Sequence, residues 1–438
     1  MELDVKNQYW MGKIPDSWET KKIKFVLSQR NENNVPIKST EILSLTAKQG
    51  VIPYSEKEGG GNKPKQDFSA YKLTYPGDIV MNSMNILSGA VGLSKYMGCI
   101  SPVYYALKPK NNTDDVRFFY YVFANKIFQS SLLGLGNGIL IKQSDNGNFN
   151  TIRMRIPIEK INNLSVPYPS PSIQQQIADF LDHKTAEIGG LIDKIHTEID
   201  TLKQYQSSVI TQAVTKGLDP NVQMKDSGIE WSGEIPETWK TIKIKYLVDK
   251  LERGTAPKYT ELHETQVVNQ ATFSKGFFDK SNMRYSTIPA SQSRGLLQYQ
   301  DVLVASTGGG VLGKVHYFTE HEEFVADSHV TIVRFIAQKL IPKFGYYYLS
   351  TLYDVFNNVM AQGSTNQIEL KRDTFANSFI PFPRIEEQRV IVDYLDQKVT
   401  QIQKLINSKQ QQINQLTEYK NSLIFEYVTG KKQVKEAN

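Results

Sequence analysis

The sequence GKIPDSWETKKIKFVL, residues 12–27, returns in the same chain as GEIPETWKTIKIKYLV, residues 233–248. Both copies place Trp three residues after Pro and then alternate Ile and Lys, which is typical of a short, half-buried strand. The copies lie 221 positions apart (233 − 12), which is about the size of a domain with its connections. The repeat therefore predicts two halves that begin in the same way.

A second repeated sequence marks where each half ends. VPYPSPSIQQQIADFLD, residues 166–182, matches IPFPRIEEQRVIVDYLD, residues 380–396, at an offset of 214 (380 − 166). The first half therefore has seven more residues (221 − 214) between its entry and exit sequences than the second half. The variable part of each half lies between constant ends.

Each exit sequence is followed by mainly apolar residues at alternating spacings of four and three. Sustained over about four heptads, this spacing indicates a coiled-coil seam. Each helix is predicted to be about 40 residues, roughly 60 Å, which is longer than a small domain is wide. The predicted seam comprises Leu181, Ile188, Ile192, Ile195, Ile199 and Leu202 in the first helix, and Leu395, Val399, Ile402, Ile406, Ile413 and Leu416 in the second.

These helices could pack on their own domains, but their length favours pairing with each other. Parallel and antiparallel pairs are both open; two similar halves joined head to tail close most simply as a pseudo-twofold, antiparallel pair. The expected fold class is α+β, with two mixed α/β domains of pseudo-twofold symmetry separated by the antiparallel coiled coil. The expected boundaries are residues 1–170 and 218–383 for the domains, the latter with a linker, and 171–217 and 384–438 for the helices, the latter with a tail.

Composition limits the classes of protein to which the chain could belong. Cys99 is the only cysteine, so no internal disulfide can form, and no stretch of about 18 apolar residues occurs. We therefore expect a cytoplasmic protein that does not span a membrane. Residues 1–170 carry 21 Lys and Arg against 14 Asp and Glu, whereas residues 231–383 carry 16 against 15. The basic excess suits a polyanionic partner but also an ordinary surface.

The sequence contains no motif that predicts a catalytic site. GGGVLGKV, residues 308–315, has the spacing of a phosphate-binding loop, but Val315 stands where a Ser or Thr should hold magnesium, and the following residues suggest a strand. The six histidines offer no zinc-binding pair on a helix, and no nucleophile elbow or methyltransferase motif occurs. We expect no catalytic residue, no metal and no cofactor.

The repeated borders resemble those of the specificity (S) subunit of type I restriction-modification enzymes, over essentially the whole chain. The resemblance rests on the Ile-Pro-x-x-Trp entries, on the Pro-aromatic-Pro exits at residues 167–169 and 381–383, and on the Gln-rich runs that lead into FLD or YLD. One departure is Ile173, which stands where the second copy has Glu387.

The resemblance implies a non-catalytic protein with two target-recognition domains, each reading half of a split site in double-stranded DNA. It also implies that the helices dock methyltransferase (M) subunits, of which we expect two. The protein would also scaffold nuclease/translocase (R) subunits where the complex includes them, and the sequence does not decide whether it does. Two alternatives stay open: an enzyme that modifies or cleaves DNA on its own, and a coiled-coil assembly protein with no DNA role.

Candidate DNA contacts are polar residues in predicted loops, because Arg and Lys read guanine, Asn and Gln read adenine, and Lys, Ser and Thr bind phosphates. Polar, glycine-bearing loops follow two helices that are predicted at residues 116–132 and 343–360 and whose aromatic residues should lie in the core. The candidates are Lys48, Gln49, Lys63, Lys65, Asn82, Ser83, Asn85, Lys142 and Gln143 in the first domain, and Arg253, Lys258, Tyr259, Asn269, Arg284, Arg294, Ser306, Thr307, Lys314, Ser364, Asn366, Gln367 and Arg372 in the second.

Overall fold

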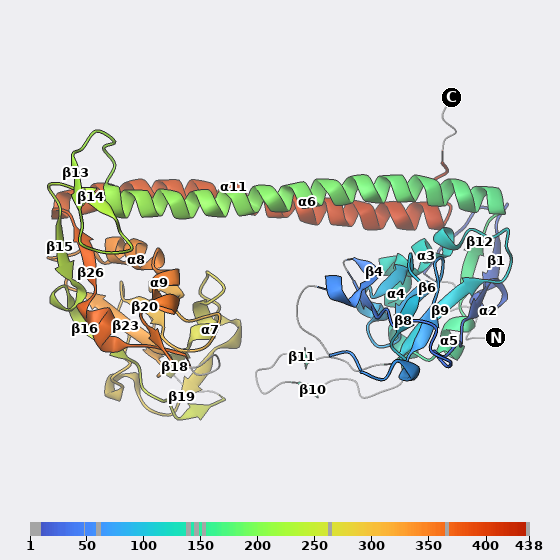
Figure 1. Ribbon diagram of the computed structural model, residues 1–438, viewed down its shortest axis with the longest axis horizontal. Helices are drawn as coiled ribbons and strands as arrows, with labels where there is room; N and C mark the ends of the chain where they lie inside the picture. The colour runs from blue at the N-terminus through green and yellow to red at the C-terminus, as the bar shows by residue number, and fades with distance from the viewer. Residues whose placement is uncertain are drawn as a thin grey trace. The chain divides into compact units, whose positions relative to one another are not determined.

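The chain forms two compact units in the computed structural model (Figure 1). The first comprises Met1–Ile195 with Gln411–Asn438, and the second comprises His196–Gln410. The structure describes residues 10–47, 49–57, 63–136, 142–143, 149–150, 155–261, 265–363 and 368–434. Each unit contains a mixed globular part and a segment of both long helices, so the predicted fold class is confirmed at the level of the elements.

The repeated entry and exit sequences pair with each other in both units. In the first unit, β1 (Glu19–Lys22) lies antiparallel to β12 (Ser165–Tyr168). In the second, β15 (Lys240–Lys243) lies antiparallel to β26 (Phe379–Phe382) in the same register. Each entry strand thus pairs with the exit strand of its own unit, where the globular part begins and ends. This shared pairing accounts for the repetition of both sequences, although the residues between them differ.

Each globular part is built on a four-stranded antiparallel sheet with the same strand order. The order is β2-β9-β6-β7 in the first unit and β16-β23-β20-β21 in the second. The strands are β2 (Leu27–Gln29), β6 (Ile79–Asn82), β7 (Val91–Leu93), β9 (Tyr104–Pro109), β16 (Val248–Arg253), β20 (Val302–Ala305), β21 (Val315–Tyr317) and β23 (Val330–Phe335). The two halves therefore share a framework as well as their borders.

The remaining strands differ more between the units. The first unit adds β3 (Leu43–Thr46), β4 (Gly50–Pro53), β5 (Lys72–Thr74), β8 (Gly98–Ile100), β10 (Lys142–Gln143) and β11 (Phe149–Asn150). The second adds β13 (Met224–Asp226), β14 (Glu234–Pro236), β17 (Tyr259–Thr260), β18 (Thr265–Val268), β19 (Arg284–Ser286), β22 (Phe324–Ala326), β24 (Ala361–Gln362) and β25 (Glu369–Leu370). In the second unit, β17, β19, β18 and β22 form another four-stranded sheet, whereas β3-β4 and β5-β8 form separate two-stranded sheets in the first.

Short helices complete both globular parts. The α-helices are α2 (Ile23–Val26), α5 (Ile158–Asn162), α7 (Gln270–Phe273) and α10 (Arg372–Asn377). The 3-10 helices are η1 (Tyr54–Glu56), η2 (Phe68–Ala70), η3 (Ile86–Ser88), η4 (Leu133–Leu135), η5 (Ile244–Tyr246), η6 (Lys280–Asn282) and η7 (Ala290–Gln292).

The two aromatic helices are shorter than the sequence predicts. Residues 116–132 form α3 (Val116–Ala124) and α4 (Lys126–Ser131), because the Asn125 side chain accepts hydrogen bonds from the backbone amides of Ile127 and Phe128 and starts a new helix. Residues 343–360 divide in the same way into α8 (Pro342–Ser350) and α9 (Tyr353–Asn358). Most of their aromatic residues, including Phe118, Phe123, Tyr348 and Phe356, are buried in the core as expected, whereas Tyr120, Tyr346 and Tyr353 are only partly buried.

The long helices are α6 (Pro171–Lys216, 46 residues) and α11 (Ile385–Val428, 44 residues). In the first unit the rings of Phe180 and Tyr427 lie 4.4 Å apart, and in the second Glu198 forms an ion pair with Lys409 at 2.7 Å. The residue numbers of both pairs sum to 607, so the helices run antiparallel in both units, as predicted. None of the twelve predicted seam residues is exposed, and Leu181 and Leu395 are fully buried. Among the described residues, no helix is both long and apolar enough to cross a membrane.

The end of each long helix packs against an entry sequence. Gly217, just after α6, lies against Trp239 and Pro236, and Gly430, just after α11, lies against Trp18 and Pro15. Both glycines have a positive φ (75° and 70°), a conformation that side chains rarely adopt. A β-carbon at Gly430 would also come within 2.5 Å of the Pro15 ring. The repeated Pro and Trp are therefore packing residues that receive the helix ends.

The repeated FLD and YLD sequences attach α6 and α11 to the globular parts. Asp182 and Asp396 each accept a short hydrogen bond, of 2.6 and 2.5 Å, from a tyrosine hydroxyl on the aromatic helix, and each also pairs with a cation. The partners are Tyr121 and Arg117 for Asp182, and Tyr347 and Lys343 for Asp396. Burial, together with the hydrogen bond to the aspartate, raises the pKa of Tyr121 and Tyr347 far above its ordinary value, which keeps both hydroxyls protonated as donors.

A buried glutamine at the start of each long helix performs a second repeated task. Gln174 and Gln388, which occupy matching positions, are fully buried. Each side-chain amide donates to a carbonyl of the exit sequence, and each side-chain oxygen accepts a backbone N–H near the start of the aromatic helix. Leaving these groups unpaired would cost about 1–3 kcal/mol each. This cost explains why both exit sequences have Gln at this position, although many of the neighbouring residues differ.

The second unit should lose stability in mild acid because of His316. This ring stacks on Phe273 and Phe278, with centroids 5.8 and 5.3 Å away, and burial lowers its pKa to about 4. Since the unfolded chain would bind a proton near pH 6.5, stability is complete above pH 6.5 and declines as the pH falls towards 4, by up to about 3 kcal/mol.

Denaturant unfolding of the wild type and of His316→Gln at pH 7.5 and pH 5 measures this effect. The wild type should lose more stability between the two pH values than the variant does. An equal loss in both proteins would contradict the assignment to His316.

Candidate nucleic-acid interface

Polar residues collect at the same edge of the central sheet in both units. In the second unit, β16 and β20 end at this edge and β23 begins there; β2, β6 and β9 have the same arrangement in the first unit. The opposite edge lies near the entry strand, because β16 follows β15 through η5. The polar edge is therefore the end of the sheet directed away from the entry strand, and we call it the distal edge.

A pocket of about 470 Å³ opens at the distal edge of the first unit. Its charged and amide groups are Lys57, Lys63, Lys65, Asn82 and Asn85, and its rings are those of Tyr54, Tyr71 and Tyr104. The described lining therefore contains three lysines and no acidic side chain. Burial raises the pKa of Tyr104, so its hydroxyl stays neutral. Lysine ammonium groups and tyrosine hydroxyls are both suited to hydrogen-bond with phosphate oxygens.

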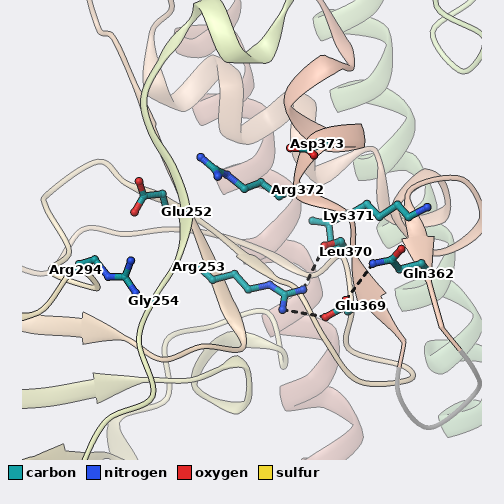
Figure 2. Close-up of a pocket in the computed structure, with 10 residues that line it drawn as sticks. All are labelled: Glu252, Arg253, Gly254, Arg294, Gln362, Glu369, Leu370, Lys371, Arg372 and Asp373. Atoms are coloured by element: carbon teal, nitrogen blue, oxygen red, sulfur yellow. Dashed lines mark hydrogen bonds and ion pairs between the residues drawn. The ribbon is translucent and has the colours of Figure 1, made fainter.

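The second unit has a larger pocket, of about 740 Å³, at the end of β16 (Figure 2). It is lined by Glu252, Arg253, Gly254, Arg294, Gln362, Glu369, Leu370, Lys371, Arg372 and Asp373. Figure 2 shows Arg294 on the opposite side of Arg253 from Glu369 and Leu370 of β25. Four cations and three carboxylates share this pocket, so it offers hydrogen-bond donors and acceptors together.

Two of the three pocket arginines are held by the protein. Arg253 pairs with Glu369 at 3.1 Å through Nη1 and donates to the Leu370 carbonyl at 3.3 Å through Nη2. The Arg253 ion pair and a hydrogen bond from Gln362 lower the pKa of Glu369, which stays ionised. Arg372 donates from Nε to the Leu251 carbonyl at 2.9 Å. These contacts orient both guanidinium groups before any ligand arrives.

The structure brings several of the sequence-predicted residues together in these pockets. Lys63, Lys65, Asn82 and Asn85 line the first pocket, and Arg253, Arg294 and Arg372 line the second. Gln49 is exposed in the turn between β3 and β4, outside the pocket lining. Asn82 is mostly buried, and its side-chain oxygen accepts the Met84 amide.

Two predicted contacts lie inside the protein. Ser83 and Ser306 are fully buried, and their hydroxyl groups donate to the carbonyls of Val103 and Val304. Neither hydroxyl is presented at the surface. Each serine follows a buried strand directly, so the chain has not yet left the core when it reaches the serine.

The remaining described candidates of the second unit make contacts of their own. Arg284 lies over the ring of Tyr259, 4.9 Å from its centroid, on neighbouring strands, and Lys314 lies 4.8 Å from the ring centroid of Tyr353. Lys258 is exposed, Asn269 caps α7, and the Thr307 hydroxyl is 2.7 Å from Nδ1 of His329. Of these, Lys258, Tyr259, Arg284 and Lys314 keep exposed side chains.

Some candidates fall where side chains are not described. Lys48, Ser364, Asn366 and Gln367 lie outside the described residues. Lys142 and Gln143 form β10, which pairs with β11, and only their backbone is described.

Sequence reasoning missed part of both pockets. Tyr54, Tyr104 and Lys57 in the first, and Glu252 and Asp373 in the second, belong to no repeated motif. Glu252 carries one signal in the sequence, which is its position two residues before Gly254. Glycine often marks the place where a chain leaves a sheet, so Glu252 is expected near the end of a strand. Across the part of the chain that the structure describes, no three His, Cys, Asp or Glu side chains gather as a metal site would require.

Comparison with known proteins gives consistent matches over both halves. A family described as "Type I restriction modification DNA specificity domain" matches residues 15–200 and 236–415. The MjaVIII specificity subunit of a type I restriction enzyme from Methanocaldococcus jannaschii is 25% identical, over 97% of this chain and 95% of its own length. The putative MjaX specificity subunit from the same organism is 21% identical, over 97% and 96% of the two chains.

A solved structure has the same fold. It comes from work on the structural basis of complex assembly and conformational transition of the type I R-M system, and matches with a TM-score of 0.66 over 95% of this chain and 98% of its own. Its sequence identity to this chain is 14%, so the similarity shows a shared fold and nothing beyond it.

Proposed function

The chain belongs to the type I restriction-modification specificity subunits, and we propose that each of its two units reads one half of a split site in double-stranded DNA through its distal edge. One observation carries this proposal: the two units share borders, sheet order and helix attachment but differ in the residues of their distal-edge pockets. A shared framework with a variable edge is what two readers of different sequences would need.

The proposed partners are two M subunits, with R subunits joining the complex for cleavage. The long helices are the proposed docking elements. Leu191, Leu405 and Tyr419 are about half exposed (46–54%) on the outer faces of α6 and α11, although both helices bury their seam residues. Exposed apolar side chains on a paired helix suit contact with a further protein. A protein that reads DNA in such a complex would work in the cytoplasm.

We propose that the chain has no catalytic role of its own and that the M subunits supply methylation. The competing possibility is an enzyme that modifies or cleaves DNA by itself. Purified chain, incubated with DNA, S-adenosylmethionine and Mg²⁺, should neither methylate nor cut; adding M subunits should produce methylation at a split site. Activity of the chain alone would overturn the non-catalytic proposal, and absence of site-specific methylation with M subunits would overturn DNA recognition.

The long helices should also set the number of unread base pairs between the half-sites. Inserting one heptad into both α6 and α11, near Ile195 and Lys409, keeps the seam in phase and lengthens each helix by about 10 Å. That length corresponds to about three base pairs, which also turn one half-site by roughly 100° around the duplex. We expect methylation of the native site to fall strongly, and residual activity to move to sites with about three more spacer base pairs.

Sequencing of methylated DNA from each variant provides the measurement. The same seven residues inserted at Asn221, in the linker after α6, form the control, because this insertion leaves both helices unchanged. A lengthened protein that remains active on the native spacer would rule out a measuring role for the helices.

A further inference from the structure

Arg294 differs from the other two arginines of the second pocket. It is exposed, and within the described residues its guanidinium has no hydrogen-bond or ion-pair partner. Arg253 and Arg372 are instead held by Glu369 and by backbone carbonyls. A bidentate contact with a base needs two free, parallel N–H groups, and Arg294 retains all of its own.

The backbone of Arg294 is nevertheless fixed. Its carbonyl accepts a short hydrogen bond from Nζ of Lys250 on β16. Side chains alternate along a strand, so Lys250 and Glu252 point to the same face of β16, towards the Arg294 segment. Figure 2 shows Glu252 and Arg294 on the same side of the pocket. An anchored arginine and an exposed carboxylate therefore lie together at the distal edge.

This pair matches one base pair better than the others. In the major groove, guanine presents two acceptors, O6 and N7, which suit arginine, and cytosine presents the N4 amino group, which suits a carboxylate. Adenine suits arginine less well, because its N6 amino group is a donor and would face the donors of the guanidinium. The amide of Gln362, the natural partner of adenine in this pocket, already donates to Glu369 at 3.1 Å. The free groups thus favour G·C.

We propose that the half-site read by the second unit contains a G·C pair, with Arg294 binding the guanine and Glu252 accepting from its cytosine. The inference rests on the proposed function and adds to it which residues read the base pair and which base pair they read. Arg253 and Arg372 act as positioning residues that give the pocket its shape. In the first unit, lysines and amides replace this combination, so the two half-sites should differ in composition.

The test uses the full chain assembled with M subunits and duplexes in which each base pair of the second half-site is substituted in turn. The second half-site is the one that changes when residues 235–383 are exchanged. In the wild type, replacing the contacted G·C pair should reduce kcat/KM for methylation about 5- to 150-fold. In Arg294→Ala, the native duplex should lose a similar factor, while substitution at that one position should no longer matter.

Further variants separate base reading from other roles. Glu252→Gln should relax discrimination at the same position, and Lys275→Ala, which removes an exposed charge outside the pocket, should leave every discrimination unchanged. A uniform loss across all duplexes in Arg294→Ala would make Arg294 a phosphate contact, and a second half-site without a required G·C pair would also overturn the inference. Both outcomes would leave the proposed function intact, whereas wild-type methylation without any sequence requirement would overturn the proposed function itself.

Discussion

Exchanging residues 235–383 for the matching segment of a relative should change one half of the recognised site completely and leave the other half unchanged. The segment carries both β15 and β26, so the entry and exit strands of the donor stay paired with each other. The host chain supplies the two long helices. Since the distal-edge pocket of the second unit lies wholly inside the segment, every proposed base contact of this unit is exchanged with it.

The choice of donor decides whether this exchange is informative. Gly217 and Asp396, which stay in the host, need the Trp and Tyr that meet them at positions 239 and 347. A donor that keeps both residues should assemble normally with M subunits. Sequencing of methylated host DNA then gives the new site. The reciprocal exchange of residues 14–170 is the control and should change only the other half-site; a change of both half-sites in either chimera would show that the units do not read DNA independently.

The borders and helices could be predicted because they are repeated within one chain. The two copies of the Ile-Pro-x-x-Trp entry can be compared with each other. The residues that are identical in both copies are those that pack. The Gln at positions 174 and 388 persisted for this reason, although its hydrogen bonds could not be foreseen. The long helices could be predicted from the spacing of apolar residues after each exit sequence, because steps of four and three follow from helix geometry alone.

The distal-edge pockets could be predicted only in part, because their residues have no counterpart in the other half. Polar residue type drew attention to Arg253 and Arg294, which line a pocket, and their role as DNA contacts stays a prediction. The same criterion selected Ser83 and Ser306, whose hydroxyls are buried, since residue type does not reveal on which side of a strand end a side chain lies. Glu252 was missed because its one signal, a place two residues before Gly254, marks the end of a strand and does not tell a functional carboxylate from any other exposed one.

Replacing Trp239 by Ala should destabilise the second unit by about 3–5 kcal/mol, and so lower its melting temperature by on the order of 10 °C. The ring is 1% exposed and packs against Gly217 at the end of α6. Its Nε1–H donates to Glu387 on α11 at 2.9 Å. The mutation therefore removes a contact to both long helices at once, opens a cavity and leaves a carboxylate without its donor.

The matching residue of the first unit provides an internal comparison. Trp18 is only partly buried and packs edge-on against Phe118 with a centroid distance of 6.5 Å, so Trp18→Ala should cost less, about 2 kcal/mol. Trp239→Phe keeps most of the ring and should lose mainly the hydrogen bond to Glu387, about 1–2 kcal/mol.

Hydrogen exchange followed by mass spectrometry can assign each loss to a unit. In Trp239→Ala, exchange should quicken in β15, in the end of α6 near Gly217 and in the start of α11, because these segments meet at the lost ring. The first unit should keep its wild-type protection, since Trp239 belongs to the core cluster of the second unit and the first unit has a core cluster of its own. Equal costs for the two Trp→Ala variants, or faster exchange spread over both units, would show that the two entry sequences are not separate attachment points for the helix ends.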